Sequence, residues 1–131
     1  MTGLDTNILV RYIMQDDAKQ SPKANRLIES LDGDNPGFIS TVSVIELFWV
    51  LSSCYGLSNA QVTQALETML RAKSFVIERP EQVAKAISMF KGGKTDFADC
   101  LIQCSAKEAG CTETMTFDVS AAKYAGMTLV Q

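Results

Sequence analysis

The spacing of apolar residues along the chain switches between two periods, which predicts short strands separated by longer helices. Apolar side chains recur three or four positions apart over residues 6–14, 22–31, about 44–54, 59–73, 80–91 and 96–109, with a further helical turn at 121–125. Short apolar runs predict strands at residues 2–5, 38–39, 75–77, 114–117 and 128–130. Helices are therefore expected to dominate.

Capping and turn residues mark the ends of several of these segments. Pro22 suits the first position of a helix with Ser21 as its N-cap, and Ser58 suits the N-cap of the helix that follows it. The pair Gly92–Gly93 predicts a turn. Strands that alternate with helices in this way are typical of an α/β domain with a mostly parallel central sheet.

Length and composition fit one domain spanning residues 1–131. A chain of 131 residues with 47% hydrophobic residues can bury a core without disulfide bonds. No apolar run approaches the ~18 residues of a membrane span, and no leader precedes the first predicted strand. We therefore expect a cytoplasmic protein with no membrane partner.

The chain contains no histidine, which limits the chemistry open to it. A histidine base, a Ser-His-Asp triad, a Cys-His nucleophile and a His-ligated metal are all excluded. The four cysteines form no CxxC pair, and we expect them to be small buried residues; they are Cys54, Cys100, Cys104 and Cys111. Catalysis would have to come from carboxylates, thiols, Lys, Tyr or a bound cation.

The net charge of −3 argues weakly against nucleic-acid binding, which usually depends on local Lys and Arg. Setting aside the four acids discussed next, 11 of the 15 acidic side chains remain against 12 basic ones. The excess acidity would then lie in one pocket that a divalent cation could neutralise.

Two aspartates directly follow predicted strands. Asp5 follows the first strand, and Asp118 follows the strand that ends at Phe117. Ligands of open α/β sheets bind at the carboxyl ends of the strands, so these acids are expected in the same region. Each aspartate could equally be a simple helix N-cap, and the sequence leaves both interpretations open.

Two further acids lie on apolar helix faces without a cationic neighbour one turn away. Glu46 lies in a helix that is apolar nearly all round, so we expect a buried carboxylate that needs protonation, a distant cation or a metal. The alternative left open is a narrow solvent-facing strip of the helix. Asp99 shares a helical line with Ile102 and Ala106, whereas Asp96 is explained by the helix dipole alone. Carboxylates grouped in this way favour a Mg²⁺ or Mn²⁺ site suited to phosphate chemistry.

Four segments resemble, in order, the motifs of PIN-domain ribonucleases, and in length and spacing those of VapC toxins from bacterial toxin–antitoxin pairs. They are residues 4–9 (LDTNIL), 43–47 (SVIEL), 96–102 (DFADCLI) and 116–118 (TFD). Each segment alone is weak, but four in order over essentially the whole chain form a specific signal. The resemblance implies a three-layer α/β/α PIN-like fold and Mg²⁺- or Mn²⁺-dependent endoribonuclease activity.

The resemblance also implies roles for individual residues. Asp5, Glu46, Asp99 and Asp118 would be the catalytic metal ligands, and Asp96 an auxiliary acid. Asn7 and Thr116 would orient carboxylates or water by hydrogen bonds. The implied partners are an RNA substrate (a tRNA or structured rRNA), a small antitoxin and a second copy of the chain. Substrate contacts are expected from basic side chains, namely Arg11, Lys91, Lys94 and Lys123.

Aromatic residues on and after the Glu46 helix exceed what one small core obviously needs, and aromatic residues are favoured at protein interfaces. Ordinary core packing stays open for Phe48 and Trp49, and the resemblance implies that part of this region contacts the dimer partner or antitoxin. The residues concerned are Phe48, Trp49 and Tyr55, with Tyr12 and Leu57. Two other functions stay open. One is a catalytically inactive PIN fold that binds RNA or protein. The other is an aspartyl-nucleophile phosphatase, which is disfavoured because Asn7 stands where a haloacid-dehalogenase-type site needs a second aspartate.

Overall fold

The computed structural model describes residues 1–92 and 94–131. The chain divides into two compact units, unit 1 (Met1–Pro80) and unit 2 (Glu81–Gln131), and each is described by itself. A single domain over residues 1–131 stays a prediction.

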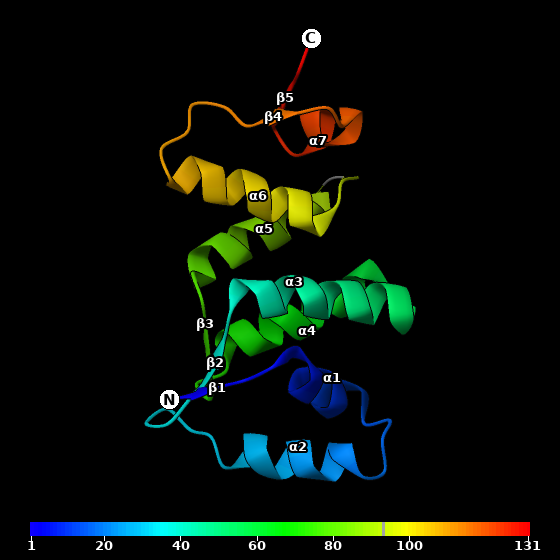
Figure 1. The fold of residues 1–131 in the computed structure, drawn as a ribbon, viewed down its shortest axis with the longest axis vertical. Coiled ribbons are helices and arrows are strands. Elements are labelled where there is room, and N and C mark those ends of the chain that lie inside the picture. Colours follow the sequence, from blue (N-terminus) through cyan, green and yellow to red (C-terminus); the bar gives the residue numbers. More distant parts are fainter. Residues whose placement is uncertain (93) are drawn as a thin grey trace. The chain divides into compact units, whose positions relative to one another are not determined.

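Unit 1 is built around three short parallel strands (Figure 1). Its elements are β1 (Thr2–Gly3), α1 (Thr6–Met14), α2 (Gln20–Glu29), β2 (Gly37–Ile39), α3 (Thr41–Trp49), the π-helix η1 (Val50–Cys54), α4 (Asn59–Arg71) and β3 (Phe75–Ile77). The strand order is β1-β2-β3, and Phe38 at the centre of β2 pairs with Gly3 and Val76. Helix α1 packs against α2 and α3.

Unit 2 contains three helices and a second parallel pair of strands. Its elements are α5 (Pro80–Gly92), which begins at the last residue of unit 1, α6 (Phe97–Glu108), β4 (Met115–Thr116), α7 (Val119–Tyr124) and β5 (Thr128–Leu129). Strand β4 pairs with β5. The α/β class, the parallel pairing and the dominance of helices are confirmed, although the described strands form two sheets of three and two strands.

Local chemistry explains why the helices begin where they do. Helix α4 carries a capping box, because Ser58 accepts from the backbone of Gln61 while the Gln61 side chain accepts from the backbone of Ser58.

Strand β2 needs a glycine at Gly37, since a Cβ there would lie 2.6 Å from Cδ1 of Leu4. This close approach lets β2 lie directly beside the segment that leads into α1.

The predicted start of the second helix is wrong. Helix α2 begins at Gln20 rather than Pro22, and its N-cap, Lys19, makes no side-chain capping bond. The carboxylate of Asp17 accepts from the backbone of Lys19 and Gln20 instead. Ser21 is buried and donates to the carbonyl of Arg11 at 2.9 Å, so its hydroxyl ties α2 to α1. The expected Gly92–Gly93 turn falls partly on residue 93, outside the described residues.

Each unit has its own buried apolar residues. In unit 1 the fully buried aliphatic side chains come from β2, α1, α3, η1 and α4, namely Ile39, Leu9, Val44, Leu47, Leu51, Val62 and Leu66. In unit 2, Phe90 of α5 meets Phe97 of α6 edge to face, with ring centroids 6.1 Å apart. A smaller cluster under α7 consists of Ala121, Ala125 and Met127.

The expectation of four buried cysteines holds for two of them. Cys100 and Cys104 lie one turn apart on α6 and are buried, whereas Cys54 and Cys111 are exposed. Burial raises the pKa of the Cys100 thiol to about 11, so this sulfur is protonated at neutral pH. Among the described helices, none is long and apolar enough to cross a membrane.

Candidate active site

In unit 1, Asp5 lies between β1 and α1 and caps the helix. Its backbone is extended, and its Oδ1 accepts from the backbone N–H of Thr6 at 2.7 Å. The side chain is exposed. The N-cap interpretation is therefore satisfied by one carboxylate oxygen, which leaves Oδ2 available for another ligand.

Thr6 connects Asp5 to Glu46, and the sequence analysis did not identify it. The Thr6 side chain is 5% exposed, and its hydroxyl donates to Oε1 of Glu46 at 3.0 Å. The same residue thus contacts Asp5 through its backbone and Glu46, forty positions away, through its hydroxyl. A buried hydroxyl needs a partner, so a threonine beside a candidate ligand was the available signal.

The expectation that Glu46 is buried is wrong. Its side chain is exposed, as are those of Val42 and Trp49 on the same helix. Helix α3 is therefore not covered on all sides, and the carboxylate of Glu46 keeps contact with solvent. Its hydrogen bond from Thr6, rather than burial, is what restrains it.

For the endoribonuclease activity expected from the sequence, replacing Thr6 by Val should reduce RNA cleavage roughly tenfold, because partners that orient metal ligands typically affect activity by that order. Thr6→Ser keeps the hydroxyl and should retain most of the activity. Thr63→Val is the matched control, since the buried Thr63 hydroxyl bonds only backbone carbonyls of α4. Both valine variants should lose about 1 kcal/mol of stability. Equal cleavage by Thr6→Val and Thr63→Val would contradict a role for Thr6 at the site.

In unit 2, two more of the predicted acids are helix N-caps. Asp96 caps α6, with Oδ1 accepting from the backbone of Ala98 at 3.0 Å. Asp118 caps α7, with Oδ1 accepting from the backbone of Ser120 at 2.8 Å and of the next residue at 3.1 Å. The Thr116 hydroxyl accepts from the backbone N–H of Asp118 at 3.0 Å, so it holds the turn rather than the carboxylate.

Asp99 is the acid in unit 2 whose environment is least favourable to its charge. Burial raises its pKa above the ordinary value, and the nearby charges of Asp96 and Asp118 raise it further. Thr95 lowers the pKa of Asp99, but its buried hydroxyl forms no hydrogen bond with any described residue. We therefore place Thr95 near Asp99 rather than bonded to it. Asp96 and Asp118 both lie close enough to Asp99 to repel its charge.

The predicted metal ligands suit a hard divalent cation, because all of them offer carboxylate oxygens. The orphaned Thr95 hydroxyl and the repulsion at Asp99 indicate a place where a cation would be favourable. Residues 1–92 and 94–131 nevertheless contain no group of three or more His, Cys, Asp or Glu side chains spaced to hold a metal ion. Asp5 and Glu46 belong to unit 1 and the other three acids to unit 2, and each group is described by itself.

The four basic residues predicted to bind substrate differ in the contacts that surround their side chains. Arg11 forms an ion pair with Asp16 at 3.1 Å and donates to the Tyr55 hydroxyl at 3.1 Å, so it is engaged in a surface network. Lys123 lies 5.4 Å from the centroid of the adjacent Tyr124 ring. Lys91 and Lys94 are exposed, as is Asn7, for which no orienting hydrogen bond is found in the described part of the chain.

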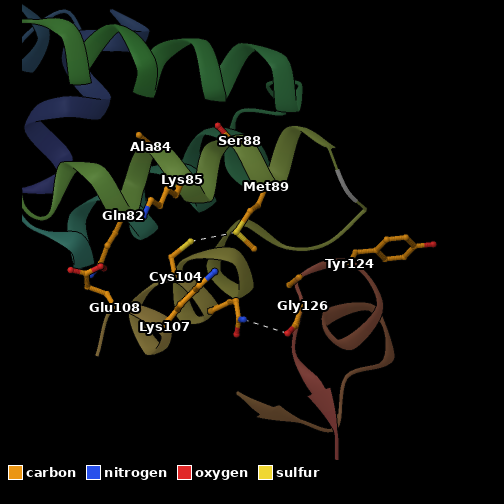
Figure 2. Close-up of a pocket in the computed structure, with 12 residues that line it drawn as sticks. Gln82, Ala84, Lys85, Ser88, Met89, Cys104, Lys107, Glu108, Tyr124 and Gly126 are labelled. Atoms are coloured by element: carbon orange, nitrogen blue, oxygen red, sulfur yellow. Dashed lines mark hydrogen bonds between the residues drawn. The ribbon is translucent and has the colours of Figure 1, made fainter. Parts of the chain in front are cut away.

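A large hollow lies in unit 2, and none of the predicted acids lines it. It has a volume of about 880 Å³ and lies between α5, α6 and the end of α7 (Figure 2). Lys85 and Lys107 both lower the pKa of Cys104 by their charge, although burial raises it more. Gln103 donates to the carbonyl of Gly126 at 3.3 Å. Because none of the predicted site residues lines this hollow, its size does not make it the active site.

Comparison with known proteins identifies the family. Residues 4–127 match the sequence model of the PIN domain. The chain belongs to the PIN domain family. The match extends over both units, and members of this family are generally nucleases that use divalent metals. No curated protein matches this PIN domain. Among solved structures, the crystal structure of FitAcB from Neisseria gonorrhoeae is similar over 100% of this chain and 97% of that chain, with 20% identity and a TM-score of 0.36.

Proposed function

We propose that this PIN domain is a metal-dependent endoribonuclease whose catalytic residues are Asp5, Glu46, Asp99 and Asp118. The observation that carries the proposal is the partly buried Asp99 carboxylate, which lies near the charges of Asp96 and Asp118 and forms no ion pair with any described residue. In the described part of the chain, none of the proposed ligands forms an ion pair. A group of unpaired acids costs stability, which is typical of a functional site.

The proposed ligands divide the work. Mg²⁺ or Mn²⁺, when bound, would supply an activated water and neutralise charge on the phosphodiester. Asp5, Glu46, Asp99 and Asp118 are the proposed metal ligands, with Asp96 as an auxiliary acid. The capping hydrogen bonds hold the carboxylates of Asp5 and Asp118 through Oδ1. Each could therefore present its second oxygen to a cation with little further loss of side-chain entropy. Lys91, Lys94 and Lys123 are the proposed contacts to the RNA backbone, and Arg11 a weaker one.

The biological setting we propose is a VapC-type toxin in the cytoplasm that is neutralised by an antitoxin and forms a homodimer. The support is the order of the four motifs together with exposed aromatic surface in unit 1. Trp49 is 61% exposed, and Tyr12 lines an apolar hollow of about 300 Å³ between α1, α2 and α4. Phe48 is buried and is part of the core rather than of a partner surface.

The direct test is cleavage of total bacterial RNA by the purified protein. Cleavage is expected with Mg²⁺ or Mn²⁺, and none in EDTA. Asp5→Asn should be inactive while retaining its helix cap, since Asn caps as well as Asp. Saturating metal should also stabilise the wild type by about 3 kcal/mol at a hundredfold excess over Kd.

Other outcomes distinguish the alternatives. Tight RNA or protein binding without cleavage in any metal would favour an inactive PIN fold that acts as a binding module. Cleavage by Asp5→Asn at the wild-type rate would contradict the assignment of the catalytic acids.

A further inference from the structure

Phe117 has the highest exposed fraction of the large hydrophobic side chains described, at 84%. It lies between Thr116 and Asp118, two residues of the proposed site. Two other apolar residues of the same short segment, Met115 and Val119, are 52% and 67% exposed. Of these three residues, Phe117 alone carries an aromatic ring, which distinguishes it from its apolar neighbours as a candidate ligand contact.

The backbone on both sides of Phe117 is fixed by hydrogen bonds. The carbonyl of Thr116 accepts from Val130 at 2.9 Å, within the β4–β5 pair. The N–H of Asp118 donates to the Thr116 hydroxyl, and the Asp118 carboxylate caps α7. With both neighbours held, the backbone that carries Phe117 is fixed in a position that leaves its ring in solvent.

An exposed aromatic ring next to a proposed nuclease site is suited to stack on a nucleobase of the substrate. Nucleobases in single-stranded RNA expose their faces, and proteins that bind single strands stack aromatic side chains on them regardless of sequence. The position of Phe117 directly before Asp118 means that a base stacked on it would belong to a nucleotide close to the phosphodiester held by the acids.

We propose that Phe117 stacks on an unpaired base of the RNA substrate and so positions the strand at the carboxylates. The inference rests on the proposed function, because it takes RNA as the substrate. It assigns to Phe117 a contribution to substrate binding that depends on the aromatic ring rather than on apolar surface alone.

The test measures binding of a short fluorescein-labelled single-stranded RNA in EDTA, where cleavage is blocked. Phe117→Leu, which keeps apolar bulk, should weaken binding about 5- to 150-fold, and Phe117→Tyr should bind as the wild type does. Met115→Ala and Val119→Ala are the matched controls and should stay within about twofold of the wild type. An RNA carrying 2-aminopurine should lose fluorescence on binding the wild type, and keep it with Phe117→Leu.

Two results would overturn the role of Phe117 and leave the proposed function intact, provided that the wild type cleaves RNA. One is binding by Phe117→Leu within twofold of the wild type, and the other is 2-aminopurine fluorescence that the wild type does not quench. Equal weakening by Met115→Ala, Val119→Ala and Phe117→Leu would indicate a general apolar contact and would also overturn it. Wild-type protein that neither binds nor cleaves RNA in any metal would instead reject the proposed function, and the stacking role with it.

Discussion

Replacing Asp99 by Asn is expected to abolish RNA cleavage while raising the free energy of unfolding of the metal-free protein. The loss of activity should be at least about 100-fold, because the variant loses the charge of a proposed metal ligand. The gain in stability arises because Asn carries no charge to be desolvated or to be repelled by Asp96 and Asp118. Since Asp99 is only partly buried and solvent screens it, the gain should be about 1 kcal/mol or less, or roughly 2–4 °C in Tm.

The stability gain should depend on pH in a defined direction. The pKa of Asp99 is raised in the folded protein, so the folded state binds the proton more tightly than the unfolded state. The loss of folding stability caused by ionised Asp99 is therefore absent below the ordinary aspartate pKa. It develops as the pH rises through the pKa of Asp99 in the folded state. Thermal unfolding of Asp99→Asn and wild type in EDTA should differ at neutral pH and converge in acid.

Asp96→Asn is the matched control for this prediction. It removes a neighbouring charge but keeps the cap of α6, so it should also stabilise the protein. As an auxiliary acid, Asp96 should affect cleavage much less than Asp99. A larger loss of activity in Asp96→Asn than in Asp99→Asn would reverse the roles assigned to the two acids. An Asp99→Asn protein that is less stable than wild type at neutral pH would contradict the described environment.

Leu47→Ala is expected to give the largest loss of stability, about 2–5 kcal/mol. Leu47 directly follows Glu46 on α3 and is 0% exposed, so truncation leaves a cavity in the core of unit 1. A loss of this size is a substantial part of the 5–15 kcal/mol typical of a domain and should lower Tm by roughly 10 °C. Urea or thermal denaturation followed by circular dichroism measures it.

Val42→Ala tests the same helix on its solvent side. Val42 is 67% exposed, so the variant should stay within about 0.5 kcal/mol of the wild type. A Leu47→Ala midpoint equal to that of Val42→Ala would mean that α3 does not pack as described.

The sequence predicted the elements well where the chain itself supplies the boundary. The capping box at Ser58 marks α4, and the apolar run at residues 75–77 coincides with β3. The start of α2 was missed because its capping carboxylate, Asp17, lies outside the helix, while Ser21 makes a tertiary bond that no local pattern encodes. The separation of the strands into two sheets likewise depends on pairing between distant segments.

For the candidate site, the sequence suggested the acids but did not predict the environment of each one. The apolar composition of α3 suggested a buried Glu46, yet composition does not tell which turn of a helix faces solvent. The Thr6 hydroxyl could not be assigned to Glu46 without the fold, because the two are forty positions apart. The roles of the four proposed ligands and of the basic residues stay predictions.

The capping role of the aspartates affects how sequences of related proteins should be read. Asp5, Asp96 and Asp118 each close the first turn of a helix, so natural selection for folding alone would retain a capping residue (Asp, Asn or Ser) at these positions in a lineage that had lost catalysis. Glu46 caps no helix and accepts a hydrogen bond from Thr6. Among relatives, an aspartate replaced by another capping residue would therefore indicate lost catalysis with the fold kept, whereas an aspartate that persists would not by itself indicate activity.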